Sequence, residues 1–381
     1  MKLKKYISEN KIVTIPATVF IFLGIISVIV WRLSIKYVQV ADFFAGTISF
    51  VLRFILTKIT YFIPFSLAEF IIYISVPLFI FLFIKLVTAK KKWTALFKFL
   101  YRTAAVWGLL MFIFTFNFGV CYGTTPVNEK IGFERRLLEI EDLASAMQIL
   151  ISESREVSGN IKYVYSETGS TAMPYSLKEL NKKLNEAYKN MLERHDLFKR
   201  IYSRVKPVIL SEQMSKTHIT GIYVPFTGEA NVNIDFPDYN LPFTAAHEMA
   251  HLMGVGREDE ANFVAFLVCI YSGDDYIRYS GLVSMTEYIG NALYKADKDR
   301  YYEITKELPE IISQEMAAYS RFFDKYRNTE ISKVANAVNN TYLKSQGQEQ
   351  GAKSYGFVVD LATVYLLDVY EKNGEIIYAE K

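Results

Sequence analysis

The stretch 244–266, TAAHEMAHLMGVGREDEANFVAF, is the part of the sequence that constrains the fold and the chemistry of this chain most strongly. It contains the pattern His247-Glu248-x-x-His251, with two of the chain's four histidines. Good helix formers precede the pattern, and on a helix residues i and i+4 lie on one face. Both imidazoles can therefore approach a single metal ion with Glu248 beside them. The alternative is that they are hydrogen-bonded core histidines.

A glycine corner follows the histidines. Gly254 and Gly256 predict that the helix ends just after His251. The acidic run that begins at Glu258 predicts the first turn of a second helix, because the helix dipole favours negative charge there. The sequence thus predicts two helices that meet at a tight turn.

A third metal ligand is needed, because a catalytic zinc commonly has three protein ligands and a water molecule. Glu258 and Glu260 are both close enough in sequence to complete the set. We favour Glu258, because Asn262 then lies one helical turn further on, where its amide can hydrogen-bond a ligand histidine. Glu260 is the alternative ligand, and it is otherwise expected to be either a solvated acid or one that the helix dipole favours.

These residues resemble those of the gluzincins, a class of zinc peptidases with H-E-x-x-H followed by E-x-x-A-N/D-x-x-A. The resemblance implies that Glu258 is the third zinc ligand and that Asn262 supports a ligand. It also implies that Glu248 is the general base of peptide-bond hydrolysis. The metzincin pattern, in contrast, fails at Arg257, because a guanidinium has no lone pair to offer a metal.

A longer resemblance surrounds the histidines. The segments PFTGEANVN, LPFTAAHEMAH and REDEANF, between Val224 and Phe266, are similar to a bacterial family of membrane proteins, domain of unknown function 3810. The resemblance implies a membrane architecture and a zinc site. It implies no substrate.

A small sheet is predicted just before the first helix, because β-branched and aromatic residues alternate with polar ones in 205–210 and 218–234. Zinc peptidases commonly pair an extended substrate with an edge strand at this point. By that resemblance Gly228, Glu229 and Asn231 are expected to bind substrate, with an ordinary hairpin as the alternative. Five further side chains could stabilise an oxyanion: Tyr276, Tyr279, Tyr355, Arg278 and His218.

The first third of the chain is far more apolar than the rest. Roughly 19 residues of helix cross a bilayer core, and three stretches are long enough: 13–31, 63–86 and 103–121. Between the first two, the stretch 41–60 carries Arg53 and Lys58. Spaced charges favour a helix in the plane of the membrane interface, with a fourth span as the alternative.

Basic residues predict the orientation, because cytoplasmic loops carry an excess of Lys and Arg. They cluster before the first span, at Lys2, Lys4, Lys5 and Lys11, and between the second and third, from Lys85 to Arg102. Three spans then place everything after Cys121 outside the cytoplasm. The net charge of +3 reflects this topology, and no nucleic-acid partner is expected.

The sequence therefore predicts a multi-pass protein of the inner (cell) membrane with two parts. Residues 1–121 form a transmembrane anchor with three helical spans, and residues 122–381 form an extracytoplasmic, mainly α (α+β) zincin-like domain with a small sheet. The expected cofactor is zinc, and the expected partners are the lipid bilayer and a peptide or protein substrate. Two non-catalytic alternatives are a structural zinc site and a scaffold that binds peptide or envelope polymer.

Overall fold

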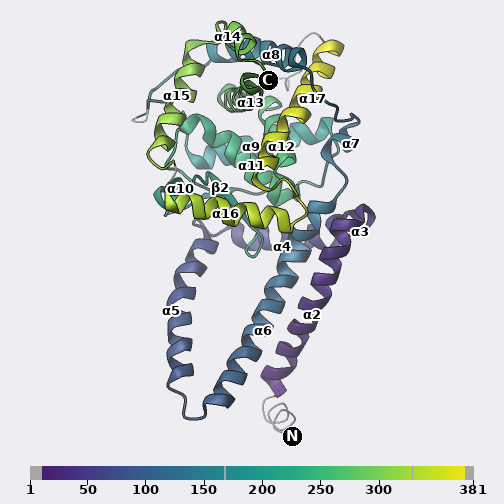
Figure 1. The fold of residues 1–381 in the computed structure, drawn as a ribbon, viewed down its shortest axis with the longest axis vertical. Helices are drawn as coiled ribbons and strands as arrows, with labels where there is room; N and C mark the ends of the chain where they lie inside the picture. Colours follow the sequence, from purple (N-terminus) through teal and green to yellow (C-terminus); the bar gives the residue numbers. More distant parts are fainter. Residues whose placement is uncertain (1–10, 167–168, 328, 374–381) are drawn as a thin grey trace. The chain divides into compact units, whose positions relative to one another are not determined.

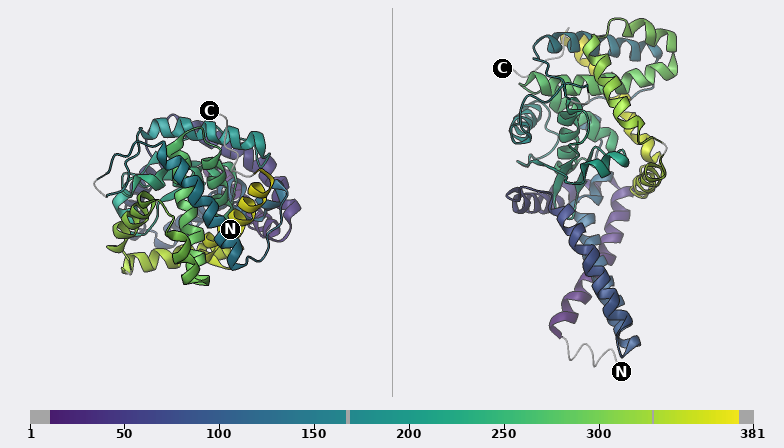
Figure 2. Two further views of the ribbon diagram at one scale, coloured as in Figure 1. Left: turned by 90° about the horizontal axis from the view of Figure 1, so that it is seen from above. Right: turned by 90° about the vertical axis from the view of Figure 1, so that its left-hand side faces the viewer.

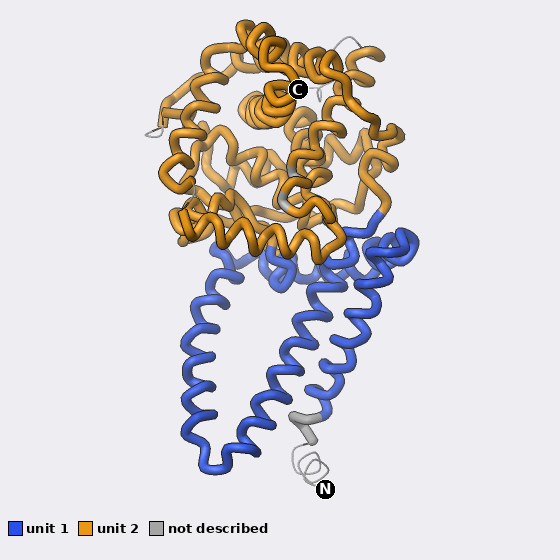
Figure 3. The backbone as a smooth tube through the Cα atoms, in the orientation of Figure 1, with its two compact units in different colours: residues 1–124, 224–228 blue, residues 125–223, 229–381 orange. Residues whose placement is uncertain are grey.

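The computed structural model describes residues 11–166, 169–327 and 329–373. It divides the chain into two compact units (Figure 3): unit 1 comprises residues 1–124 and 224–228, and unit 2 comprises residues 125–223 and 229–381. Three of the basic residues that predict the orientation, Lys2, Lys4 and Lys5, lie outside the described residues. The assignment of residues 1–121 to an anchor and of residues 122–381 to an extracytoplasmic domain stays a prediction.

Unit 1 is helical, as its long apolar stretches predict. Its elements are α2 (Lys11–Lys36), α3 (Val38–Phe44), a π-helical turn (Ala45–Ser49), α4 (Phe50–Tyr61), α5 (Leu67–Val87), α6 (Lys92–Asn117) and a 3-10 helix (Gly119–Gly123). Nearly every side chain between Phe70 and Lys85 on α5 is exposed. Such an apolar and exposed helix suits contact with lipid.

Four helical segments of unit 1 are long and apolar enough to cross a membrane: Ile15–Lys36, Val38–Tyr61, Leu67–Val87 and Lys92–Asn117. Three of them match the predicted spans. The fourth, Val38–Tyr61, contains the stretch that we expected in the plane of the interface. In Figures 1 and 2, α4 runs across the long helices of unit 1 instead of alongside them. The in-plane position is consistent with this course and stays a prediction.

Two glycines let α2 and α6 approach closely. A Cβ atom on Gly24 would lie 2.5 Å from the Cα of Gly108, and one on Gly108 would lie 2.2 Å from the carbonyl oxygen of Phe20. Side chains at these positions would force the backbones apart, so the absence of a Cβ allows this packing.

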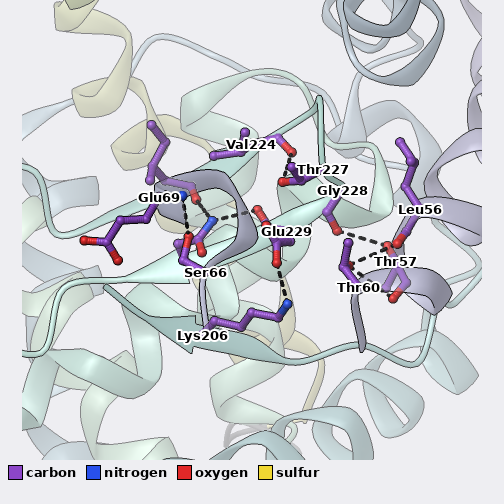
Figure 4. Close-up of polar contacts among 12 residues, drawn as sticks. Leu56, Thr57, Thr60, Ser66, Glu69, Lys206, Val224, Thr227, Gly228 and Glu229 are labelled. Atoms are coloured by element: carbon purple, nitrogen blue, oxygen red, sulfur yellow. Dashed lines mark hydrogen bonds and ion pairs between the residues drawn. The ribbon is translucent and has the colours of Figure 1, made fainter. Parts of the chain in front are cut away.

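Unit 1 also includes a turn that is distant in sequence, residues 224–228. The hydroxyl of Thr57 on α4 donates to the carbonyl of Gly228 at 3.2 Å (Figure 4). Arg53 of the same helix is buried and donates to the carbonyls of Asn117 (2.8 Å) and Ala45 (3.3 Å). Arg53 is therefore hydrogen-bonded inside unit 1 and does not lie on its surface.

Unit 2 is mostly helical with one small sheet, which confirms the predicted fold class. Its helices are α7 (Val127–Ile131), α8 (Ile140–Gly159), α9 (Leu177–Arg194), α10 (Ser211–Lys216), α11 (Leu241–Met253), α12 (Glu258–Ile270), α13 (Asp275–Ala296), α14 (Lys298–Thr305), α15 (Glu310–Asp324), α16 (Glu330–Ser345) and α17 (Val358–Asn373), with 3-10 turns at Asp238–Asn240 and Gly351–Phe357. Every residue of α11 and α12 is buried. Helices that are buried on every side belong at the centre of a domain, and α11 and α12 hold that place in unit 2 (Figure 1).

The sheet has three strands, β1 (Val205–Pro207), β2 (Gly221–Val224) and β3 (Glu229–Val232), in the order β1-β3-β2. β1 and β3 are parallel, with Lys206 opposite Asn231. The side chain of Lys206 forms a fully buried ion pair with Glu229 (Figure 4). β3 packs on α11, so the sheet supports the helix that carries the histidines.

Candidate metal centre

The glycine corner brings the ends of α11 and α12 together. Gly254 ends α11 in the left-handed region, at φ 101°, where a side chain would be strained. The N–H groups of Gly254 and Val255 then donate to the carbonyls of His251 (2.9 Å) and Ala250 (3.0 Å). The chain reverses within four residues, so that Glu258, the first residue of α12, faces the end of α11.

Three buried side chains converge at this corner. The Nε2 atoms of His247 and His251 lie 3.0 Å apart, and Oε2 of Glu258 lies 3.3 Å from the first and 3.2 Å from the second. One ligand atom from each residue lies within 4.8 Å of the others. The group could therefore hold a metal ion.

Hydrogen bonds behind the histidines orient their free nitrogen atoms. Nδ1 of His247 lies 2.8 Å from Oδ1 of Asn262, and Nδ1 of His251 lies 2.7 Å from the carbonyl oxygen of Val255. Both oxygens can only accept, so each Nδ1 carries a proton and each Nε2 has a lone pair for a metal whenever it is itself deprotonated. Two such lone pairs and a carboxylate that point at one place need a cation between them, either a proton or a metal ion. Two imidazole nitrogens and one carboxylate oxygen are a donor set that suits zinc.

The other acidic residue of the corner, Glu260, has different partners. Its Oε1 accepts from Arg257 at 2.9 Å and from the N–H of Val127 at 3.1 Å. Glu260 is buried in the first turn of α12, so it is not solvated, whereas the alternative of an acid favoured by the helix dipole agrees with its position. The structure thus places Glu258, and not Glu260, with the histidines.

Glu248 is buried beside this group and is only partly satisfied. One hydrogen bond reaches its carboxylate from the backbone N–H of Tyr223 on β2. Among the described residues, its Oε2 has no hydrogen-bond partner. Burial raises the pKa of Glu248 to about 7, although the two histidines oppose the rise. A buried carboxyl oxygen without a partner suits a site that binds water or substrate.

The charges of the group depend on one another in the metal-free chain. Burial lowers the pKa of His251, but the Glu258 carboxylate more than offsets this and raises the pKa to about 9. Burial alone would raise the pKa of Glu258, whereas the two histidines hold it far below its usual value. The carboxylate is therefore strongly stabilised by positive charge at this point.

Comparison with known proteins adds a family. The model of a protein family of unknown function, DUF3810, matches residues 44–363. The chain belongs to this family. No curated protein and no solved structure matches the chain. The match includes the corner and all of its ligand atoms, so the candidate metal centre lies within the DUF3810 region.

The suggested oxyanion residues of this DUF3810 member have other partners. The hydroxyls of Tyr276 and Tyr279 bond to Thr171 (3.3 Å) and Glu315 (3.5 Å), and Arg278 forms an ion pair with Asp275. His218 stacks on Phe323 with ring centroids 5.2 Å apart. The side chain of Tyr355 is not among those that the structure describes.

Sequence reasoning missed the surroundings of the centre. Tyr288 of α13 lies behind Asn262, which donates to its hydroxyl at 3.3 Å. A Cβ atom on Gly221 of β2 would lie 2.5 Å from Oε1 of Glu248, so a side chain there would displace the Glu248 carboxylate. No short-range pattern marks either residue, because both reach the site through tertiary packing.

The predicted substrate segment has a different place in the sheet from the one expected. β3 has β1 on one side and β2 on the other, so it has no free edge. Glu229 is paired with Lys206, and the amide of Asn231 donates to the carbonyl of Ile222 at 3.3 Å. A substrate role for Gly228, Glu229 and Asn231 stays a prediction, but an edge strand at this position was the wrong expectation. The outer strand beside Glu248 is β2.

Proposed function

We propose that the chain is a membrane-anchored, zinc-dependent peptidase. The observation that carries this proposal is the convergence of His247 Nε2, His251 Nε2 and Glu258 Oε2 beside the incompletely bonded carboxyl of Glu248. The three atoms would hold zinc, with Asn262 and the Val255 carbonyl fixing the imidazoles. When bound, zinc would polarise a scissile carbonyl and lower the pKa of a water molecule toward neutrality.

Glu248 would move the proton in this reaction. Its free Oε2 would accept the proton of the attacking water and transfer it to the leaving amine. The hydrogen bond from the N–H of Tyr223 would hold the other part of the carboxylate in place. A purely structural zinc site needs no general base, and for that reason we favour a catalytic zinc site over a structural one.

The direction of the β2 backbone supports an extended substrate. The carbonyls of Thr220 and Ile222 accept from Asn233 (2.9 Å) and Asn231 (3.3 Å), so these residues turn toward β3. Since strand residues alternate, the backbone groups of Gly221 and Tyr223 turn to the opposite edge. There the N–H of Tyr223 meets Glu248. A polypeptide that pairs with this edge would pass directly beside the general base.

The experiment measures bound zinc and the cleavage of a peptide library by the full-length protein. We expect wild type to bind zinc and cleave, Glu248→Gln to bind zinc without turnover, and His247→Ala to do neither. Zinc with equal turnover in wild type and Glu248→Gln would remove the proposed role of Glu248. Zinc without turnover in wild type would favour the structural site or the binding scaffold. A wild type that binds no zinc would overturn the whole proposal.

A further inference from the structure

Helix α16 exposes a stripe of aliphatic side chains. Ile331, Val334 and Val338 are 56%, 62% and 65% exposed. Their spacing of three and four residues places them on one face of the helix. Leu343, which is buried, belongs to a different face and anchors the helix. The exposed stripe is therefore distinct from the packing face.

More exposed aliphatic residues lie on segments that Figure 1 and the right-hand view of Figure 2 place at the same end of unit 2 as α16. Ile209 precedes α10, Ile222 is on β2, and Ile234 follows β3. Two hydrogen bonds connect the segments of Ile209 and Ile234: Val208 N–H to the Val232 carbonyl (3.0 Å) and Ile234 N–H to Ser211 Oγ (3.0 Å). We call the six residues Ile209, Ile222, Ile234, Ile331, Val334 and Val338 the apolar end of unit 2; all six are exposed.

Single exposed aliphatic residues are common, but a gathered set marks an interaction surface. We propose that the apolar end of unit 2 docks on a lipid bilayer, with the stripe of α16 immersed at the interface. A helix with one aliphatic stripe, a packed face and a polar face is the form that surface-bound helices take.

Two observations favour lipid over a protein partner. First, the same chain carries helices long and apolar enough to cross a membrane, so a bilayer is always within reach of unit 2. Second, the segment 321–345 has five basic and two acidic residues, a net charge of +3. The ammonium of Lys325 lies 4.4 Å and 4.7 Å from the ring centroids of Phe322 and Tyr326. Basic and aromatic side chains beside an aliphatic stripe suit an anionic lipid surface.

The proposal does not depend on the metal centre, and its test uses no activity. The full-length protein is reconstituted in phosphatidylethanolamine and phosphatidylglycerol vesicles, some with lipids that carry a nitroxide near the headgroup. Val338→Cys is labelled with an environment-sensitive fluorophore. The matched control is Asn336→Cys, an exposed position two residues away and thus on the opposite side of α16. The unsubstituted chain, whose Cys121 and Cys269 are buried, gives the background.

We expect the label at position 338 to lose about half of its emission to the nitroxide lipids, because a docked apolar face reaches the headgroup boundary. The label at position 336 should lose little. Equally weak quenching at both positions would overturn the proposal. Blue-shifted emission at position 338 without quenching would overturn it too, because a substrate peptide or a second copy of the chain would then cover the stripe.

Discussion

Two buried charge clusters of unit 2, one in the sheet and one at the end of α11, are completed differently. In the sheet, the carboxylate of Glu229 meets the ammonium of Lys206. At the corner, the ion pairs of the Glu258 carboxylate with described residues are to two imidazoles, whose Nδ1 atoms bond to Asn262 and Val255. The first cluster contains its own cation. The second has the geometry of a site whose cation comes from solution.

This difference explains what each cluster can do. A buried carboxylate is costly unless a cation compensates it. In the sheet the cation that neutralises Glu229 is the side chain of Lys206, so this pair serves the stability of the fold. At the corner the Glu258 carboxylate raises the pKa of His251 to about 9, so the compensating charge in the metal-free chain is a proton, which a metal ion can replace on Nε2.

The largest effect is expected from breaking the internal pair. Lys206→Met leaves Glu229 buried without its cation and should lower the free energy of unfolding by about 3–5 kcal/mol. The double variant Lys206→Met/Glu229→Leu should recover most of that loss, because it removes the stranded charge as well. Urea titration of the full-length protein, followed by proteolysis, measures both. A double variant no more stable than the single one would show that the pair has a role beyond charge compensation.

The second comparison removes the carboxylate of the corner. In wild type, zinc at a hundredfold excess over its dissociation constant should add about 2.7 kcal/mol to the free energy of unfolding. Glu258→Gln should abolish this increment. Glu260→Gln is the matched control: its carboxylate bonds to Arg257 and Val127, so the zinc-dependent increment should persist. The increment is read within each variant, so a change in basal stability does not obscure it. If Glu260→Gln loses the zinc-dependent increment and Glu258→Gln keeps it, Glu260 is the third ligand.

A smaller effect should come from the residue behind a ligand. Asn262→Ala removes the acceptor for Nδ1–H of His247 and should weaken zinc binding roughly 10- to 100-fold. Asn262→Asp keeps an accepting oxygen and should retain most of the affinity. Competition with a chromophoric chelator measures both constants. An alanine variant with wild-type affinity would mean that Asn262 packs against the imidazole without orienting it.

The sequence predicted those features of the site that depend on spacing along one helix or across one tight turn. The i, i+4 spacing placed His247 and His251 on one face, and the glycine corner brought Glu258 back to them. The preference for Glu258 over Glu260 also agrees with the structure. The long apolar runs of unit 1 similarly predicted its helices, because the length of a span follows directly from the rise per residue.

The order of the strands could not be read in this way. An ordinary hairpin was the alternative for residues 218–234, and β2 and β3 are indeed neighbours in the sheet, but β1 pairs with the other side of β3 and so places β3 in the middle. Which strand has the free edge depends on the distant segment 205–207. The contact of Gly221 with Glu248 is non-local for the same reason. The course of residues 38–61 is also undecided by composition, since an in-plane helix and a span can share the same hydropathy.

A half-buried acid, Glu287, is a third case for this comparison. Among the described residues, no ion pair joins Glu287 of α13 to a basic side chain, and burial raises its pKa to about 7. When the pKa of an acid is higher in the folded state than in the unfolded state, ionisation of that acid lowers the free energy of unfolding. Stability should therefore fall as pH rises from the unfolded value near 4.5 through 7.

With zinc removed by a chelator, Glu287→Gln should be more stable than wild type by about 1–2 kcal/mol at pH 8, and the difference should shrink toward pH 5. Glu307→Gln, whose side chain is 75% exposed, is the control and should show no such trend. A pH-independent difference at Glu287 would mean that packing, and not an uncompensated charge, governs this position.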